Sequence, residues 1–240
     1  MGHQIHLEIQ RQPCNTTCGP TCLHALYRYY EDQVPLEQVI GEAPRLEEGG
    51  TLAVMLGGHA LRRGYDVTIC TFNLQVFDPT WFQRSGETRA GVNLAEKLQQ
   101  QADAKPRTKT ARASKAYIDF LSRGGRIRME DLTASLLRRY LKQSIPLLTG
   151  LSATYLYHES REIGALSQPD DVRGDPSGHF VVLCGYDKEH RNVTIADPWL
   201  PNPISTDHHY SVDLDRVICS ILLGIVTYDA NLLIIQPRKQ

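Results

Sequence analysis

Four residues able to carry out hydrolysis occur in a fixed order along this chain: Gln12, Cys18, His179 and Asp197. A thiolate can attack a carbonyl, an imidazole can move the proton, and a carboxylate can orient the imidazole. An amide side chain can bind the oxyanion that develops on the attacked group. Gly19 follows Cys18 at what we expect to be a helix N-terminus, which favours the thiolate. The set predicts a cysteine hydrolase that acts through a Cys18 acyl-enzyme.

The spacing of His179 and Asp197 supports their pairing. His179 begins an apolar stretch, and Asp197 ends the next one. If the two stretches form a hairpin with Cys184 opposite Asn192, His179 faces Asp197 directly. Opposed side chains in such a pair have Cβ atoms about 5 Å apart. We therefore expect Asp197 to hold an N–H group of the His179 ring.

Each of the four residues also has a structural interpretation when taken alone. Cys18 is then a buried thiol, His179 a core histidine, Asp197 part of a turn before Pro198, and Gln12 a polar surface residue. Their common order and spacing favour the catalytic interpretation.

The cysteines at positions 14, 18 and 22 recur every four residues, which raises the alternative of a metal site. No Cys-x-x-Cys pair occurs, and Pro13 interrupts a helix through all three. We expect no metal and no cofactor. Cys14 is then either a redox neighbour of Cys18 or a thiol without a role.

The elements that must position these residues follow from apolar periodicity. Helices come first and antiparallel strands later, which predicts an α+β fold. Expected helices span 21–31, 34–43, 51–63, 92–102, 116–122, 129–143 and 212–223, and expected strands span 67–72, 146–151, 153–157, 179–186, 193–196 and 232–236.

Domain organisation follows from length and local composition. We expect residues 1–240 to form a single domain, with 73–128 as a helical insertion. Within it, Lys105–Lys115 carries five positive charges and no negative one. We interpret this segment as a solvated loop, the alternative being a dock for an acidic substrate.

Composition excludes several classes of function. With 26 basic and 27 acidic residues the net charge is −1, which favours neither nucleic acid nor an anionic membrane as partner. We find no secretory signal, and no apolar run approaches the roughly 20 residues that span a bilayer. Six cysteines are too few for a disulfide scaffold. We expect a cytoplasmic protein with free thiols.

Three motifs resemble those of the C39-like cysteine peptidases of the papain-like superfamily. They are Gln12-Pro-Cys-Asn-Thr-Thr-Cys18-Gly-Pro-Thr-Cys22, then Gly178-His179-Phe-Val-Val-Leu-Cys-Gly-Tyr186, then Ala196-Asp197-Pro198. The resemblance covers the first and last thirds of the chain. It implies a papain-like fold with helices carrying the cysteine and an antiparallel sheet carrying histidine and aspartate. Cys18 would be the nucleophile, His179 the base and acid, Asp197 the orienting group and Gln12 part of the oxyanion hole.

Longer stretches are similar to stand-alone bacterial members found near ATP-grasp ligases, which implies a functional link to such a ligase. Leader-peptide cleavage after two glycines, known from exporter domains of the family, is not carried over, because this chain has no exporter part. The substrate would be a peptide or protein, cleaved at a peptide or isopeptide bond. Alternatives are an acyl or peptidyl transferase that uses the same triad, and a catalytically silent peptide-binding module.

The loop from Tyr157 to Gly178 precedes the catalytic histidine, and loops of this length are often functional. We assign substrate binding to residues in or beside this loop and to one that follows Asp197. If the cleft is basic, an acidic peptide such as a glutamate-extended tail would suit it. The assigned residues are Tyr157, Arg161, Arg173, Gly178 and Trp199.

Overall fold

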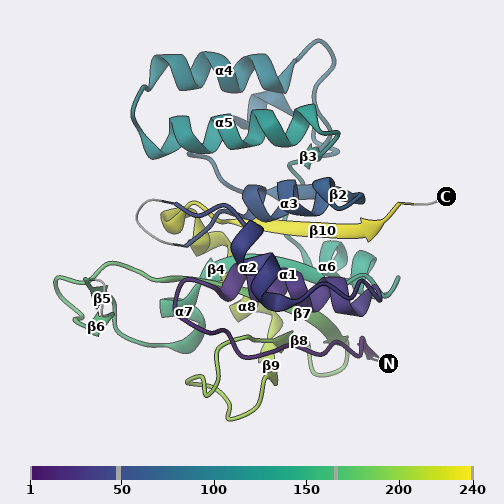
Figure 1. Cartoon of the computed structure of the whole chain (residues 1–240), viewed down its shortest axis with the longest axis vertical. Helices are drawn as coiled ribbons and strands as arrows, with labels where there is room; N and C mark the ends of the chain where they lie inside the picture. The colour runs from purple at the N-terminus through teal and green to yellow at the C-terminus, as the bar shows by residue number, and fades with distance from the viewer. Residues whose placement is uncertain (1, 47–49, 165–166, 239–240) are drawn as a thin grey trace.

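The computed structural model describes residues 2–46, 50–164 and 167–238. A large sheet, antiparallel except for one strand pair, forms its centre (Figure 1). This arrangement confirms the predicted α+β class. Across the sheet the strands follow the order β3 (Arg126–Arg128), β2 (Tyr65–Thr71), β10 (Asn231–Pro237), β4 (Leu147–Ser152), β7 (Gly178–Asp187), β8 (Asn192–Ala196) and β9 (His209–Asp213), and β1 (His3–Gln4) pairs with β7.

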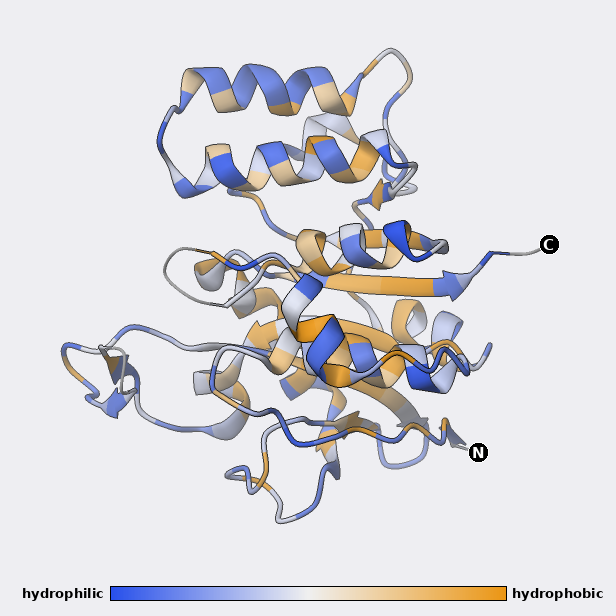
Figure 2. Ribbon diagram, in the orientation of Figure 1, coloured by the Kyte–Doolittle hydropathy of each residue, from blue (hydrophilic) through white to orange (hydrophobic). Residues whose placement is uncertain are grey.

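Helices cover the middle of the sheet. Every residue of β4 is buried, as are the interior residues of β7, so both faces of these strands are covered. The helix α1 (Cys18–Tyr29) packs on β7, and α8 (Leu214–Leu223) packs on β4. Figure 2 shows the resulting apolar centre between more polar outer surfaces. The helices α2 (Leu36–Glu42) and α3 (Ala53–Arg62) follow α1 along the chain.

Two further helices, α4 (Leu94–Ala104) and α5 (Lys109–Ser122), lie between β2 and β3 in sequence, after the short 3-10 helix η1 (Pro79–Trp81). They pack against each other, and α5 packs on α3 (Figure 1). The prediction of a solvated loop over 105–115 is wrong in its second half. Thr108 caps α5 there, because its Oγ1 accepts a hydrogen bond from the backbone N–H of Ala111 at 3.1 Å.

Two other expectations need correction. The predicted strand over 153–157 is the short helix α7 (Ala153–Tyr157). The predicted helix over 129–143 is shorter, because α6 spans Ala134–Leu141. Glu130 lies before that helix and forms ion pairs with Arg128 and Arg139. The strand β9 was not predicted.

The loop between α7 and β7 contains a small two-stranded sheet of β5 (Glu162–Ile163) and β6 (Gln168–Pro169). Residues 165 and 166, between these strands, lie outside the described residues. A second 3-10 helix, η2 (Gly224–Thr227), follows α8. In the described parts of the chain, no helix is long and apolar enough to cross a membrane.

The N-terminal segment, residues 2–12, runs along the sheet towards α1 (Figure 1). Besides the pairing of β1 with β7, the backbone N–H of Ile5 donates to the carbonyl of Cys184 at 2.7 Å. The backbone N–H of Gln12 donates to the carbonyl of Pro198 at 2.8 Å. The segment that precedes Cys18 is therefore fastened to strands and loops from the far end of the chain.

Candidate active site

Cys18 is the first residue of α1 and is half-buried. Its backbone N–H lies in the first turn, where no partner exists within the helix. Gly19 brings this end of the helix close to β7. A Cβ atom on Gly19 would lie 2.8 Å from the Thr51 side chain and 3.2 Å from the Phe180 ring. The helix and strand therefore meet where Cys18 and His179 lie, with glycine as the residue that permits the approach.

His179 lies near the start of β7 and is only 7 % exposed. Its Nε2 donates to Asp197 Oδ1 at 2.8 Å, which leaves Nδ1 as the ring nitrogen available to the Cys18 thiol, whose interaction with the ring contributes to the pKa of His179. Burial alone would lower the pKa of His179, but the charge of Asp197 and the bonds to Asp197 and Cys18 outweigh it. Together they raise the pKa of His179 to about 10. The ring is therefore held as an imidazolium that can stabilise a thiolate on Cys18.

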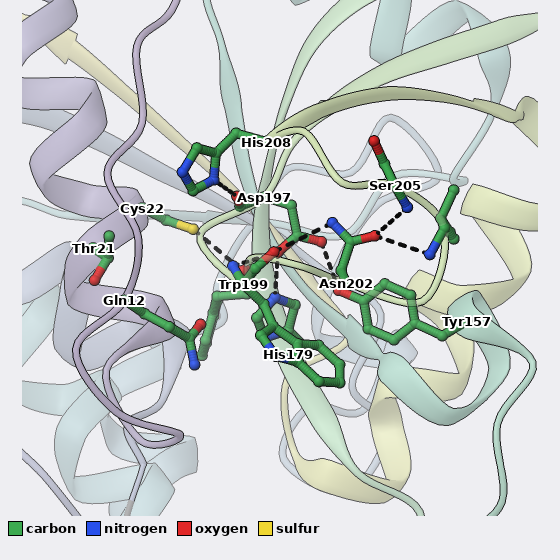
Figure 3. Close-up of polar contacts among 12 residues, drawn as sticks. Gln12, Thr21, Cys22, Tyr157, His179, Asp197, Trp199, Asn202, Ser205 and His208 are labelled. Carbon is green, nitrogen blue, oxygen red and sulfur yellow. Dashed lines mark hydrogen bonds and ion pairs between the residues drawn. The ribbon is translucent and has the colours of Figure 1, made fainter.

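Asp197 is fully buried, and its side chain accepts four hydrogen bonds, of which those from His179, Trp199 and Tyr157 can be followed in Figure 3. Oδ1 accepts from His179 and from the backbone N–H of Trp199 at 2.9 Å. Oδ2 accepts from the hydroxyls of Tyr157 at 2.6 Å and Tyr210 at 2.5 Å. Burial would raise the pKa of Asp197, but the charge of His179 and these bonds hold it below its usual value. The carboxylate stays ionised and fixes the orientation of the imidazole.

The predicted strand register is wrong, although the pairing it was meant to explain is present. Val182 pairs with Ala196 in the structure, where the prediction placed Phe180. The shift is two residues, and side chains alternate along a strand with a period of two. His179 and Asp197 therefore stay on the same face as diagonal neighbours, a separation that longer side chains can bridge.

Gln12 reaches the site from the N-terminal segment, and its side chain lies beside His179 in Figure 3. Its Nε2 donates to the carbonyl of Cys14 at 3.0 Å. That carbonyl also accepts from the backbone N–H and the hydroxyl of Thr17. The second Nε2 hydrogen remains, and the buried Oε1 of Gln12 has no partner in the described structure. The amide is thus placed at the site with hydrogen-bonding capacity unused.

Three of the residues assigned to substrate binding lie around His179. Gly178 and Trp199 line the same pocket as His179 and Gln12. The Trp199 ring lies 6.2 Å from the His179 ring between centroids, so it covers the His179–Asp197 bond on one side. Tyr157 is buried, and its hydroxyl binds Asp197. The geometry places Tyr157 behind the carboxylate, and it is not among the residues that line the pocket, so its role in substrate binding stays a prediction.

The structure does not bring Arg161 and Arg173 to His179. The guanidinium of Arg161 donates to the carbonyls of Asp171 and Val172. Arg173 forms an ion pair with Asp170 at 2.7 Å. Both arginines therefore stabilise the loop that contains them. Among the described residues, no arginine or lysine lines the pocket at His179, and a role for Arg161 and Arg173 in substrate binding stays a prediction.

Sequence reasoning missed Tyr210, which lies in β9. Its side chain and that of Val212 are buried while their neighbours are exposed. This alternation was visible in the sequence as His209-Tyr-Ser-Val-Asp213 and could have revealed the strand. Glu162, which lines the pocket of His179, was also missed. No sequence signal distinguishes it from the other charged residues of its loop.

All six cysteines are free thiols. Cys22 is buried in α1 and donates to the carbonyl of Phe180 at 3.2 Å. Hydrogen bonds with Thr16 and Thr17 lower the pKa of the exposed Cys14. Cys14 is therefore an exposed thiol with a lowered pKa beside Gln12 and Trp199. Over the described residues, no group of three histidine, cysteine or acidic side chains is placed to hold a metal ion.

Comparisons with known proteins agree with this geometry. A sequence model of the Peptidase_C39 like family matches residues 3–216, a range that includes all four residues of the proposed site. No match was found among curated proteins.

Among solved structures, the chain is similar to a C39-like peptidase from Bacillus anthracis, with 12% identity, 99% of each chain covered and a TM-score of 0.52. It is also similar to xylellain, a cysteine protease from Xylella fastidiosa, with 14% identity, 99% of this chain and 86% of that one covered, and a TM-score of 0.47. A third is a double glycine motif protease from a transporter, in complex with its leader peptide, with 14% identity, coverage of 98% and 95%, and a TM-score of 0.46. The Bacillus anthracis structure supports the fold.

Proposed function

The chain belongs to the Peptidase_C39 like family and is a papain-like cysteine peptidase, and on this premise we propose that it cleaves peptide or isopeptide bonds through a thioester at Cys18. The observation that carries the proposal is the chain of contacts from Cys18 to His179 to Asp197, with the histidine–carboxylate bond at 2.8 Å. Cysteine hydrolases need a nucleophile within reach of a base that a third group orients.

The steps follow from the positions of these groups. His179 holds the proton from the Cys18 thiol, and the thiolate adds to the carbonyl carbon. The oxyanion accepts hydrogen bonds from the backbone N–H of Cys18 and from Nε2 of Gln12. The tetrahedral intermediate collapses, the C–N bond breaks, and His179 donates its proton to the leaving amine. Water, deprotonated by His179, then attacks the thioester, which releases the acid and restores the thiol.

Two features support a peptide as the substrate. The second Nε2 hydrogen of Gln12 is unused, and an N–H donor is what the carbonyl of a peptide group binds. The family to which the chain belongs is one of peptidases. Six free thiols fit a reducing compartment, so we also propose a cytoplasmic location. The link to an ATP-grasp ligase stays a prediction.

Limiting iodoacetamide at pH 6, followed by mass spectrometry, tests the activated thiolate. Cys14 has a lowered pKa and would compete, so the experiment uses a Cys14→Ser background. We expect selective labelling of Cys18, slower in His179→Ala on the order of 10²-fold or more. Equal rates in the two proteins would refute the catalytic pair and favour the silent binding module.

Turnover by the same protein separates hydrolysis from transfer. Peptide pools are incubated with and without a primary amine, and the products are identified by mass. We expect free acids in both cases, because water can attack the thioester. Exclusive formation of amine adducts would instead assign the transferase alternative.

A further inference from the structure

A pocket of about 220 Å³ opens on the catalytic histidine. It lies between the N-terminal segment, the start of β7 and the loop that contains β5. Because His179 and Gln12 both form part of its wall, this pocket is the place we assign to the peptide on one side of the scissile bond. Its lining residues are Gln12, Asn15, Ala153, Glu162, Ser167, Ser177, Gly178, His179 and Trp199.

The charge of this pocket is negative. Among the described lining residues, Glu162 and His179 are the ionisable ones, and no lysine or arginine is present. The charge of His179 is paired with that of Asp197, whose Oδ1 lies 2.8 Å from Nε2 of His179. Glu162 is therefore the one lining charge that is free to act on a bound molecule.

Glu162 and the preceding Arg161 belong to different pockets. Arg161 lines a neighbouring pocket, where it binds the carbonyls of Asp171 and Val172. Glu162, the first residue of β5, lines the pocket that His179 also lines. Its backbone N–H and carbonyl bond with Asp175 at 3.0 and 2.9 Å, which fixes its position.

The carboxylate of Glu162 has no hydrogen bond or ion pair within the described part of the chain, although its residue is partly buried. Asp170, an acid of the same loop, binds Arg173 and two backbone N–H groups. The side chains of Glu159, Asp171 and Asp175 also have no partner among the described residues, but these three are exposed. Glu162, in contrast, is partly buried at the pocket of His179. A carboxylate without a partner in such a pocket gains most from a cation that also donates hydrogen bonds.

We propose that Glu162 determines specificity by binding a cationic group of the peptide substrate, either a lysine or arginine side chain or a free amino terminus. The inference rests on the proposed function, because it assigns a substrate class to the same site. It replaces the expectation of an acidic substrate. The preference for a cation over a neutral group is expected to be on the order of tenfold, as for a hydrogen-bonded charge pair.

Three small alkylating reagents test the charge of the pocket on the Cys14→Ser protein. They are iodoacetamide, iodoacetate and N-(2-aminoethyl) iodoacetamide, which are neutral, anionic and cationic. The measured quantity is the ratio of cation to anion labelling rates at Cys18. We expect Glu162→Gln to lower this ratio about tenfold and Glu162→Lys to lower it further. Glu159→Gln is the matched control, because Glu159 is an exposed acid at the other pocket.

The reagents separate the two possible failures. If iodoacetamide labels Cys18 of the Cys14→Ser protein no faster than it labels Cys18 after the further substitution His179→Ala, the proposed function fails. If labelling is fast but Glu162→Gln and Glu159→Gln leave the same ratio as wild type, the role of Glu162 fails while the proposed function stands.

Peptides then identify the group that is bound. Matched substrates carry lysine, norleucine or glutamate at each position beside the cleaved bond, with a free or acetylated amino terminus. We expect kcat/KM to favour lysine, or the free terminus, over its neutral counterpart in wild type. That preference should disappear in Glu162→Gln and persist in Glu159→Gln. A preference for glutamate in wild type would overturn the inference.

Discussion

At the residue scale, the site depends on how Asp197 is held. Four donors surround one carboxylate, and two of them are tyrosine hydroxyls. Tyrosine can donate from a buried position without carrying a charge. Burial and the neighbouring carboxylate raise the pKa values of both Tyr157 and Tyr210, so the hydroxyls remain protonated. The arrangement keeps Asp197 charged, and through it His179.

Tyr210→Phe tests this dependence. Removing one donor raises the pKa of Asp197, which weakens its hold on the imidazolium and lowers the pKa of His179. A histidine whose pKa is raised on folding contributes to the unfolding free energy. This contribution is complete below about pH 6.5 and is lost as pH rises through about 10. In Tyr210→Phe we expect this contribution to be lost at a lower pH than in wild type. The alkaline limb of the pH profile of Cys18 labelling should move to lower pH with it. Unfolding free energy should fall by about 1.5–3 kcal/mol.

Tyr30→Phe is the matched control for the tyrosine prediction. The hydroxyl of Tyr30 donates to the carbonyl of Ile235 at 2.9 Å, in a part of the fold without contact to Asp197. The Tyr30→Phe substitution should lower the unfolding free energy without moving the alkaline limb of the labelling profile. An identical labelling profile in Tyr210→Phe and Tyr30→Phe would show that Tyr210 is only structural.

At the element scale, the contact of α1 with β7 places the nucleophile. Gly19→Ala would put a Cβ atom 2.8 Å from Thr51 and 3.0 Å from Leu56. We expect a loss of about 1–3 kcal/mol in unfolding free energy, as for other overpacked sites. The start of the helix must also shift, so Cys18 labelling should slow. Urea denaturation and labelling rates measure the two effects.

Gly41→Ala provides the opposite case within the same protein. Gly41 lies in α2, and a Cβ atom there would meet nothing within 4 Å. Alanine is favoured over glycine in a helix, so stability should rise by about 0.5–1 kcal/mol. If both substitutions changed the unfolding free energy in the same direction, close packing would not be the cause of the effect at Gly19.

Sequence reasoning found most elements but failed where a helix begins at a polar cap. Three helix starts were misplaced or missed, and all three follow a serine or threonine that accepts a backbone N–H: Ser152, Thr108 and Thr133. Each cap satisfies a donor that the helix leaves unpaired. Apolar periodicity is weak near these points, and the aromatic run of 153–157 reads as a strand. Local hydrogen bonds outweighed the pattern.

The same reasoning explains what was predictable about the site. The order of Gln12, Cys18, His179 and Asp197 was readable because it lies in short motifs. The register of β7 and β8 was not readable, because the length of the hairpin and a bulge between Leu183 and Gly185 determine it. Tyr210 and Glu162 depend on contacts between distant segments, which one sequence does not reveal.

At the scale of the whole molecule, stability should depend on an acid far from the reaction. Asp229 is 8 % exposed and accepts from the backbone N–H of Ala53, the first residue of α3, at 3.0 Å. Burial raises its pKa to about 7, although that bond and the charge of Lys109 act against it. The folded protein thus holds the proton more tightly than the unfolded chain.

The sign of this effect gives a prediction for Asp229→Asn. A carboxyl with a raised pKa contributes stability fully below about pH 3.9, its unfolded value, and the contribution is lost as pH rises through about 7. The asparagine variant keeps the acceptor and does not titrate. We expect wild type to lose unfolding free energy relative to Asp229→Asn between pH 5 and pH 8, measured by urea denaturation. If the unfolding free energies of the two proteins differed by the same amount at pH 5 and at pH 8, this prediction would be contradicted.

The N-terminal segment has a consequence for how catalytic competence is acquired. Gln12 precedes the nucleophile by six residues, yet its backbone is bonded to Pro198 and its segment to β7. The amide that we propose for the oxyanion hole therefore reaches its place only after the last third of the chain has folded. On this proposal a nascent chain carries its thiol early but completes its oxyanion hole late. Proteolytic cleavage between Leu7 and Gln12 would likewise leave a protein whose Cys18 is still alkylated but which no longer turns over substrate.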